Sequence, residues 1–144
     1  MNLRRIHSKN ADYQKFEVLK TNRNKRHRYG EFFVEGVRNI NEAIRNGWRI
    51  SSFLYTPDRP LSRWARGILD TVEADTVFEL PAALMEDLSG KEDTSELLAV
   101  VRMREDAATR LQLSDKPVLA LFDRPSNRGN LGTIIRSWPF RKVV

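Results

Sequence analysis

The residues best placed to do chemistry lie near the C-terminal end of the sequence, in residues 123–137, DRPSNRGNLGTIIRS. An apolar run, residues 118–122, precedes them and is typical of a buried parallel strand. Loop-forming residues then lead into Leu131, where a helical pattern opens. Because backbone N–H groups and the helix dipole are exposed where a strand meets a helix through such a loop, this is a usual place for ligand binding in α/β domains.

Asn130 and Arg136 are the two side chains of this segment that favour a reaction site. If the helix begins near Asn130, Arg136 lies almost two turns further along and could fold back to present a cation to a phosphate. A structural interpretation stays open, because asparagine is a favoured helix N-cap and the loop can be an ordinary turn. The glycines follow neither the Walker A nor the Rossmann order.

This segment resembles a known family. Gly129 with residues 130–136, NLGTIIR, is similar to motif 1 of the SpoU/TrmH branch of the SPOUT RNA methyltransferases. That family transfers a methyl group from S-adenosylmethionine to a ribose 2′-hydroxyl of rRNA or tRNA. The resemblance implies that Asn130 and Arg136 are catalytic, with Arg136 activating the 2′-hydroxyl or holding the neighbouring phosphate.

A second resemblance lies nearer the N-terminus. Residues 33–38, FVEGVR, followed by Glu42 and Ala43, resemble the signature of the SpoU substrate-binding domain, which has a ribosomal-protein-like α/β/α fold. The resemblance implies that Arg38 contacts RNA. Two structural interpretations stay open, because Glu35 can favour the start of the next helix and Arg38 can pair with Glu42.

The densest positive charge lies in residues 20–28, KTNRNKRHR, with Tyr29 beside it as a possible stacking surface. Most such runs are solvated loops. Lys and Arg side chains also supply the phosphate contacts that give affinity for nucleic acid without reading its sequence. The predicted RNA-binding side chains are Lys20, Arg23, Lys25, Arg26, Arg28 and Arg38.

Composition narrows the class of protein. The 144 residues include 25 Lys or Arg and 19 Asp or Glu, and the net charge of +6 favours an anionic partner. The absence of cysteine excludes a disulfide framework and fits a cytoplasmic protein. With 2 histidines and no long apolar run, we expect no metal site and no membrane span.

The predicted helices and strands alternate along the first part of the chain. Residues 1–9 are expected to be basic and loose. Short loops and apolar strands predict a three-layer α/β/α sandwich with a largely parallel sheet. The helices are expected to bury sets of apolar residues at helical spacing, among them Tyr13, Phe16 and Leu19 in the first and Val37, Ile40 and Ile44 in the second. Strands are expected at residues 31–35, 50–55, 75–79 and 97–101, and helices at residues 10–20, 37–46, 62–70 and 81–88.

The chain is expected to contain two domains. Residues 1–104 are predicted to form an RNA substrate-binding domain, residues 105–116 a linker, and residues 117–144 the start of a SPOUT methyltransferase domain. The expected fold class is therefore α/β, with a three-layer ribosomal-protein-like domain followed by an incomplete SPOUT domain.

The family pattern is not complete in this sequence. No counterpart of the later motifs, which in the family supply most of the cofactor pocket and the dimer interface, follows Ser137, and Pro139 opposes a continued helix. We therefore expect a truncated or frameshifted chain that binds S-adenosylmethionine poorly and is inactive, with cofactor-binding residues unknown. The complete enzyme is expected to be a homodimer.

Three functions stay open. The first is the N-terminal part of an S-adenosylmethionine-dependent RNA 2′-O-ribose methyltransferase, and the second is a stand-alone RNA-binding module formed by residues 1–104. The third, weaker alternative is a domain whose positive charge only aids solubility. In each case residues 118–122 form an apolar strand without neighbours, which must dock on the first domain, pair with another chain or aggregate.

Overall fold

A five-stranded sheet organises the first part of the chain. The computed structural model describes residues 2–137, and the chain divides into two compact units, Met1–Arg104 and Glu105–Val144. The strand order of the sheet is β1-β4-β3-β5-β2. The strands are β1 (Asn2–Arg5), β2 (Glu31–Glu35), β3 (Ile50–Tyr55), β4 (Ala74–Glu79) and β5 (Leu97–Arg102). The four strands predicted between residues 31 and 101 are thereby confirmed to within a residue at each end.

Helices connect the strands of this unit. Asn10 and Ser62 begin α1 and α4, because each side-chain oxygen accepts a hydrogen bond from a backbone N–H three residues later. The predicted helices are confirmed to within a residue at each end. The helices are α1 (Ala11–Thr21), α2 (Arg23–Tyr29), α3 (Val37–Arg45), α4 (Arg63–Thr71) and α5 (Ala82–Leu88).

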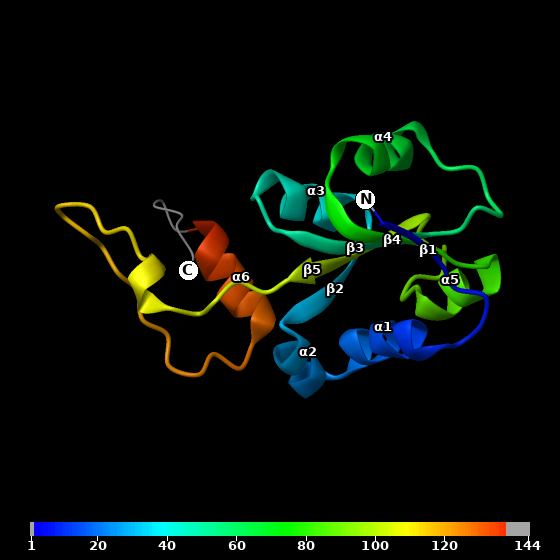
Figure 1. Ribbon diagram of the computed structural model, residues 1–144. Helices are drawn as coiled ribbons and strands as arrows, with labels where there is room; N and C mark the ends of the chain where they lie inside the picture. The colour runs from blue at the N-terminus through cyan, green and yellow to red at the C-terminus, as the bar shows by residue number, and fades with distance from the viewer. Residues whose placement is uncertain (1, 138–144) are drawn as a thin grey trace. The chain divides into compact units, whose positions relative to one another are not determined.

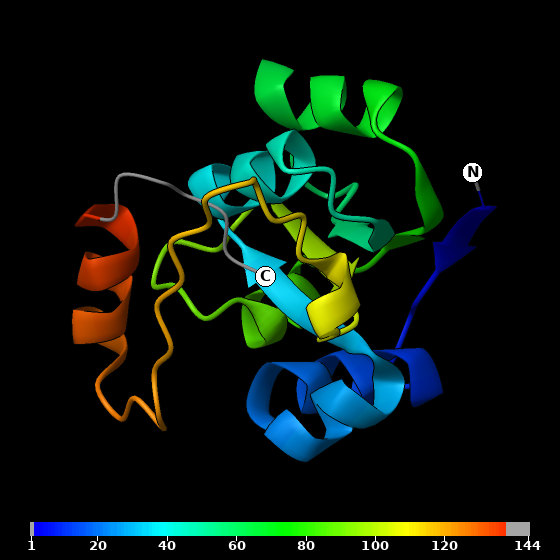
Figure 2. The same cartoon turned by 90° about the vertical axis from the view of Figure 1, so that its left-hand side faces the viewer.

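The helices cover both faces of the sheet. In Figure 1, α1 and α5 lie on one side of the strands and α3 and α4 on the other, and the turned view of Figure 2 keeps α1 and α4 on opposite sides. Adjacent residues of β4 enter different cores: Phe78 packs with Phe16 of α1, and Val77 packs with Ile40 of α3. This alternation confirms the predicted three-layer α/β/α fold.

The predicted direction of the strands is wrong for β5. Strands β1, β4 and β3 are parallel to one another, but β5 runs antiparallel to both β3 and β2. Helix α5 has 7 residues and is about 10 Å long, whereas a strand of 6 residues spans about 20 Å. The chain therefore leaves α5 at the edge of the sheet where β4 ends, and β5 must run back.

Two further predictions in this unit are wrong. Residues 1–9 were expected to be loose, yet Asn2–Arg5 pairs in parallel with β4, and Arg5 forms an ion pair with Glu79 at 2.7 Å. Backbone pairing of an edge strand requires no apolar pattern, so the sequence carries no signal for it. Val37, expected on the buried side of α3, is 51% exposed, because apolar spacing does not reveal how far a helix extends past the sheet.

The second unit is mostly irregular. Within its described residues it contains a 3₁₀ turn, Ala108–Arg110, and α6 (Arg128–Ser137). The strand predicted at residues 118–122 is absent, and Leu121 is 98% exposed. A buried strand needs neighbours for its backbone N–H and C=O groups, and residues 105–137 form no strand to provide them.

The expectation for the tail after Ser137, including Pro139, lies outside the described residues. No helix found within residues 2–137 has the length and apolar character needed to cross a membrane.

Candidate nucleic-acid interface

The basic run of residues 20–28 forms the end of α1 and most of α2, not a loop. The side chain of Asn22 accepts a hydrogen bond from the backbone N–H of Lys25 at 3.1 Å and so starts α2. Gly30, with φ of 63°, ends it in the left-handed conformation that glycine adopts readily. The prediction of a solvated loop is therefore wrong in structure, although α2 buries no residue.

The cations of this run have no acidic partners. Within residues 2–137 none of the side chains Lys20, Arg23, Lys25, Arg26 and Arg28 forms an ion pair, while cations on neighbouring elements pair with carboxylates. The Nε atom of Arg26 is buried and has no hydrogen-bond partner in the described part of the chain. The positive charge of these five side chains is therefore available to an anion.

Tyr29 is less open to stacking than its exposure suggests. Its side chain is 47% exposed, but the ammonium of Lys15 lies 5.2 Å from the ring centroid. The same ammonium pairs with Glu31 at 2.6 Å. One face of the ring is therefore already occupied by a cation–π contact.

Arg38 is the second residue of α3 and is exposed. The pairing with Glu42 that the sequence left open is not formed: Glu42 pairs with Arg45 at 3.1 Å, and its backbone carbonyl accepts a hydrogen bond from the Asn46 side chain at 2.7 Å. Among the residues that the structure describes, Arg38 takes part in no ion pair. This leaves its guanidinium free for a ligand.

Glu35 has a different role from the one its position suggested. Its carboxylate accepts hydrogen bonds from the hydroxyl of Ser89, the backbone N–H of Gly90 at 2.8 Å and the hydroxyl of Ser95 at 2.8 Å. Burial acts to raise the pKa of Glu35, but these hydrogen bonds and the charge of Lys91 outweigh burial, so the pKa lies below its ordinary value. Glu35 is thus an ionised anchor for residues 89–95.

Two lysines, Lys91 from this loop and Lys20 from α1, lie near the end of β2. The Nζ atom of Lys91 lies 2.6 Å from the position that a Cβ on Gly36 would occupy, and the Nζ atom of Lys20 lies 3.9 Å from the corresponding position at Gly90. The sequence did not identify Lys91. The signal available was the cluster of Ser89, Gly90 and Ser95 around this lysine, since such residues favour ordered turns.

The structure thus groups only some of the predicted RNA-binding residues. The Nζ atoms of Lys20 and Lys91 lie near Gly90 and Gly36 beside Glu35, and we call these two lysines the Glu35 cluster. Arg38 follows Glu35 by three residues and lies on α3, and the remaining predicted cations form a second group on α2. Side chains of this kind can hold phosphate groups and provide no general base.

The predicted catalytic residues lie on α6. The backbone N–H of Asn130 donates to the side chain of Asn127 at 2.9 Å, so Asn127 caps the helix and the asparagine N-cap that the sequence left open is confirmed at this residue. Arg136 folds back along the helix, with Nη2 3.4 Å from Oγ1 of Thr133 and Nη1 3.0 Å from the Cβ position of Gly132. Asn130 and Arg136 are both exposed.

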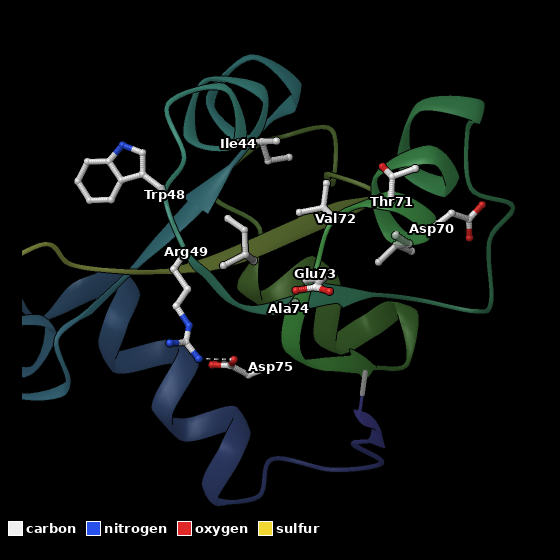
Figure 3. A pocket seen from close by; sticks show the side chains of 11 residues that line it. Ile44, Trp48, Arg49, Asp70, Thr71, Val72, Glu73, Ala74 and Asp75 are labelled. Atoms are coloured by element: carbon white, nitrogen blue, oxygen red, sulfur yellow. Dashed lines mark hydrogen bonds and ion pairs between the residues drawn. The ribbon is translucent and has the colours of Figure 1, made fainter.

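None of the predicted site residues lines the hollow of about 840 Å³ that Figure 3 shows. It is lined by apolar side chains, including Ile44 and Val72, and by an ion pair between Arg49 and Asp75 at 2.9 Å. Hydrogen bonds from Arg49 and Arg102 hold the pKa of Asp75 below its ordinary value. We assign this hollow to the junction of the strand starts and not to the nucleic-acid interface.

Comparison with known proteins finds a matching family model and a related methyltransferase. Residues 10–99 match the family model of the SpoU L30e-like domain. A 23S rRNA (uridine(2479)-2′-O)-methyltransferase from Streptomyces viridochromogenes is 45% identical over 134 residues, which are 93% of this chain and 47% of that protein.

Solved structures of methyltransferases also match this chain. The SpoU methyltransferase AviRb from Streptomyces viridochromogenes, in complex with AdoMet, matches with a TM-score of 0.74 and 44% identity over 89% of this chain and 48% of that chain. An RNA 2′-O ribose methyltransferase matches with a TM-score of 0.67 and 24% identity over 93% of this chain and 51% of that chain, which supports the fold alone.

This chain spans about half the length of these relatives. The family model covers residues 10–99 and therefore more than half of the chain. On this basis the chain belongs to the SpoU L30e-like domain family.

Proposed function

We propose that this chain is the N-terminal part of an S-adenosylmethionine-dependent RNA 2′-O-ribose methyltransferase that acts on rRNA in the cytoplasm. The observation that carries the proposal is the 45% identity to a 23S rRNA 2′-O-methyltransferase, which extends over 93% of this chain. The complete enzyme of this lineage is a homodimer in the proposal, and rRNA is preferred to tRNA because the relative acts on rRNA.

In this proposal residues 1–104 hold the RNA, residues 105–116 are a linker and residues 117–144 begin the catalytic domain. Support for the first assignment comes from cations without acidic partners at two places in the described part of the first unit, α2 and the Glu35 cluster. Phosphate contacts of this kind supply affinity that falls steeply with salt. Asn130 and Arg136 are assigned the catalytic roles that their motif implies.

S-adenosylmethionine does not fit the described part of the second unit. None of residues 105–137 is buried, so these residues form no enclosed pocket for an adenosine. We therefore propose no cofactor-binding residue here and no methyl transfer by this chain alone. This observation also favours the second candidate function, a stand-alone RNA-binding module, because the packed part of the chain is the first unit.

Binding of the full chain to a fluorescently labelled 23S rRNA fragment, measured across a salt series, tests RNA recognition. The variant with Arg23→Ala, Lys25→Ala and Arg28→Ala is expected to bind more weakly and to lower the salt slope by about one for each phosphate that it no longer neutralises. The control Arg59→Ala removes a cation that is paired with Glu86 and should bind like the wild type.

Two readouts separate the candidate functions. Transfer of a labelled methyl group from S-adenosylmethionine to the RNA by this chain would overturn the proposed inactivity and favour an enzyme complete in itself. RNA binding without transfer agrees with both candidates. Absence of RNA binding even at low salt would overturn both and leave the third alternative, in which positive charge only aids solubility.

A further inference from the structure

The loop of residues 89–95 is held by one carboxylate from a neighbouring strand. Besides donating to Glu35, Ser89 accepts hydrogen bonds at its hydroxyl oxygen from the backbone N–H groups of Lys91 and Ser95, each at 3.3 Å. The backbone N–H of Gly90 and the hydroxyl of Ser95 donate directly to the same carboxylate at 2.8 Å. The conformation of the loop around Lys91 therefore depends on the ionised Glu35 side chain, because a carboxylate accepts where a neutral group would also donate.

Two glycines make this arrangement possible. Gly36 has φ of 95°, and the Nζ atom of Lys91 lies 2.6 Å from the place where a Cβ would be. A Cβ on Gly90 would lie 3.3 Å from Oε2 of Glu35. A side chain at Gly36 would therefore displace the ammonium of Lys91, and one at Gly90 would crowd the carboxylate that orients the loop.

The cations of the Glu35 cluster keep their charge available. Glu35 accepts three hydrogen bonds from residues 89–95, and neither Lys20 nor Lys91 comes within ion-pair distance of a carboxylate among residues 2–137. Arg38 on α3 is likewise exposed and without an ion pair in that range. The two lysines that flank Glu35 favour an anion with several oxygens, of which an RNA backbone phosphate is the matching chemical class.

We propose that Glu35 is a positioning residue for RNA, which fixes residues 89–95 so that Lys91 meets a backbone phosphate beside Lys20. The inference rests on the proposed function that this chain binds RNA. It deepens that function because it assigns a phosphate contact to Lys91 and explains how the loop of residues 89–95 presents this lysine. Removal of a negative charge by itself strengthens binding to RNA, but removal of the positioning hydrogen bonds weakens it. The two effects have opposite signs, which makes the role testable.

The test compares Glu35→Gln with Glu92→Gln in the full chain. Both variants remove one negative charge, and Glu92 lies in the same loop, exposed and without a hydrogen bond among the described residues. Affinity is measured by fluorescence anisotropy with a labelled 23S rRNA fragment over a salt series. We expect Glu92→Gln to bind at least as tightly as the wild type, and Glu35→Gln to bind roughly fivefold more weakly with the salt slope lowered by about one.

A double-mutant cycle with Lys91→Ala distinguishes positioning from a general loss of structure. If Glu35 acts through Lys91, the variant with both changes binds no more weakly than Lys91→Ala alone. If the losses add, Glu35 acts elsewhere and the inference is overturned. Should Glu35→Gln unfold the chain in a thermal melt, Ser95→Ala removes a single donor to Glu35 and is tested in the same cycle.

The outcomes separate this inference from the proposed function. RNA binding by the wild type together with equal affinities of Glu35→Gln and Glu92→Gln overturns the positioning role and leaves the proposed function standing. No binding by the wild type at low salt overturns the proposed function, and the phosphate site with it. The inference is supported if Glu35→Gln binds more weakly than the wild type while Glu35→Gln adds no further loss of affinity to Lys91→Ala.

Discussion

Two apolar runs of the same length differ in burial: residues 97–101, LLAVV, are buried, and residues 118–122, VLALF, are exposed. In β5, Leu98 and Val100 are each 0% exposed, whereas in the second unit Leu119 is 66% and Leu121 98% exposed. Strand β5 has β3 on one side and β2 on the other, while no strand within residues 105–137 is available to the second run. An apolar run is therefore buried only where other segments complete its hydrogen bonds and cover both its faces.

The same substitution in the two runs gives the largest expected difference. Leu98→Ala removes fully buried methyl groups between the sheet and α1, and should lower the free energy of unfolding by about 3 kcal/mol. Leu121→Ala should change it by no more than about 0.5 kcal/mol. Urea unfolding followed by tryptophan fluorescence measures both.

Equal losses of stability from these two variants would break the contrast. That result would mean that residues 118–122 are buried in solution, as in pairing with a second copy of the chain. Chromatography with light scattering on the wild type then shows whether the chain is a dimer.

Helix caps test the same difference between the first and the second unit, with a smaller expected effect on stability. Ser62 accepts a hydrogen bond from the backbone N–H of Ala65 at 3.2 Å and begins α4, which covers the core, while Asn127 caps exposed α6. We expect Ser62→Ala to lower the free energy of unfolding by about 1 kcal/mol. Asn127→Ala should reduce helix content without moving the main unfolding transition, because α6 buries no residue.

Circular dichroism together with thermal melting tests this pair. A shift of the main transition by Asn127→Ala as large as that of Ser62→Ala would show that α6 folds cooperatively with the sheet. The contrast between the two units would then be weaker than their burial indicates.

The smallest expected effect concerns pH. Hydrogen bonds from Arg49 and Arg102 lower the pKa of Asp75, and these contacts join β4 to the ends of β3 and β5. Because the pKa is lower in the folded state, the contribution to stability is complete above the ordinary pKa and is lost as the pH falls through the folded value. Asp75 is partly exposed, so the effect is modest.

Unfolding free energies measured from neutral pH down to about pH 3 should therefore decline, and the decline should be shallower in Asp75→Asn. Asp106→Asn, a carboxylate of the second unit, serves as the matched control and should leave the slope unchanged. A slope that Asp75→Asn does not alter would remove Asp75 as a link between β4 and the ends of β3 and β5.

Local sequence was sufficient for most of the first unit and for part of the site. Four helices and four strands of this unit were predicted to within a residue because capping residues such as Asn10 and Ser62 and the apolar spacing act over a few positions. The positive charge of residues 20–28 was equally plain. Its helical form was missed, although Asn22 and Gly30 mark the ends of α2.

By itself, then, the sequence determined the order of most elements, most of the buried faces and the residues that carry positive charge, because these depend on residue type and short-range spacing. Only the tertiary structure decided the reversed direction of β5, the pairing of β1 and the exposure of residues 118–122. It also decided the contacts of Glu35 with Ser89 and Ser95, which are 54 and 60 positions away. Such contacts join distant segments, and whether a carboxylate, a glycine or an apolar run finds its partner depends on which segments the fold brings together.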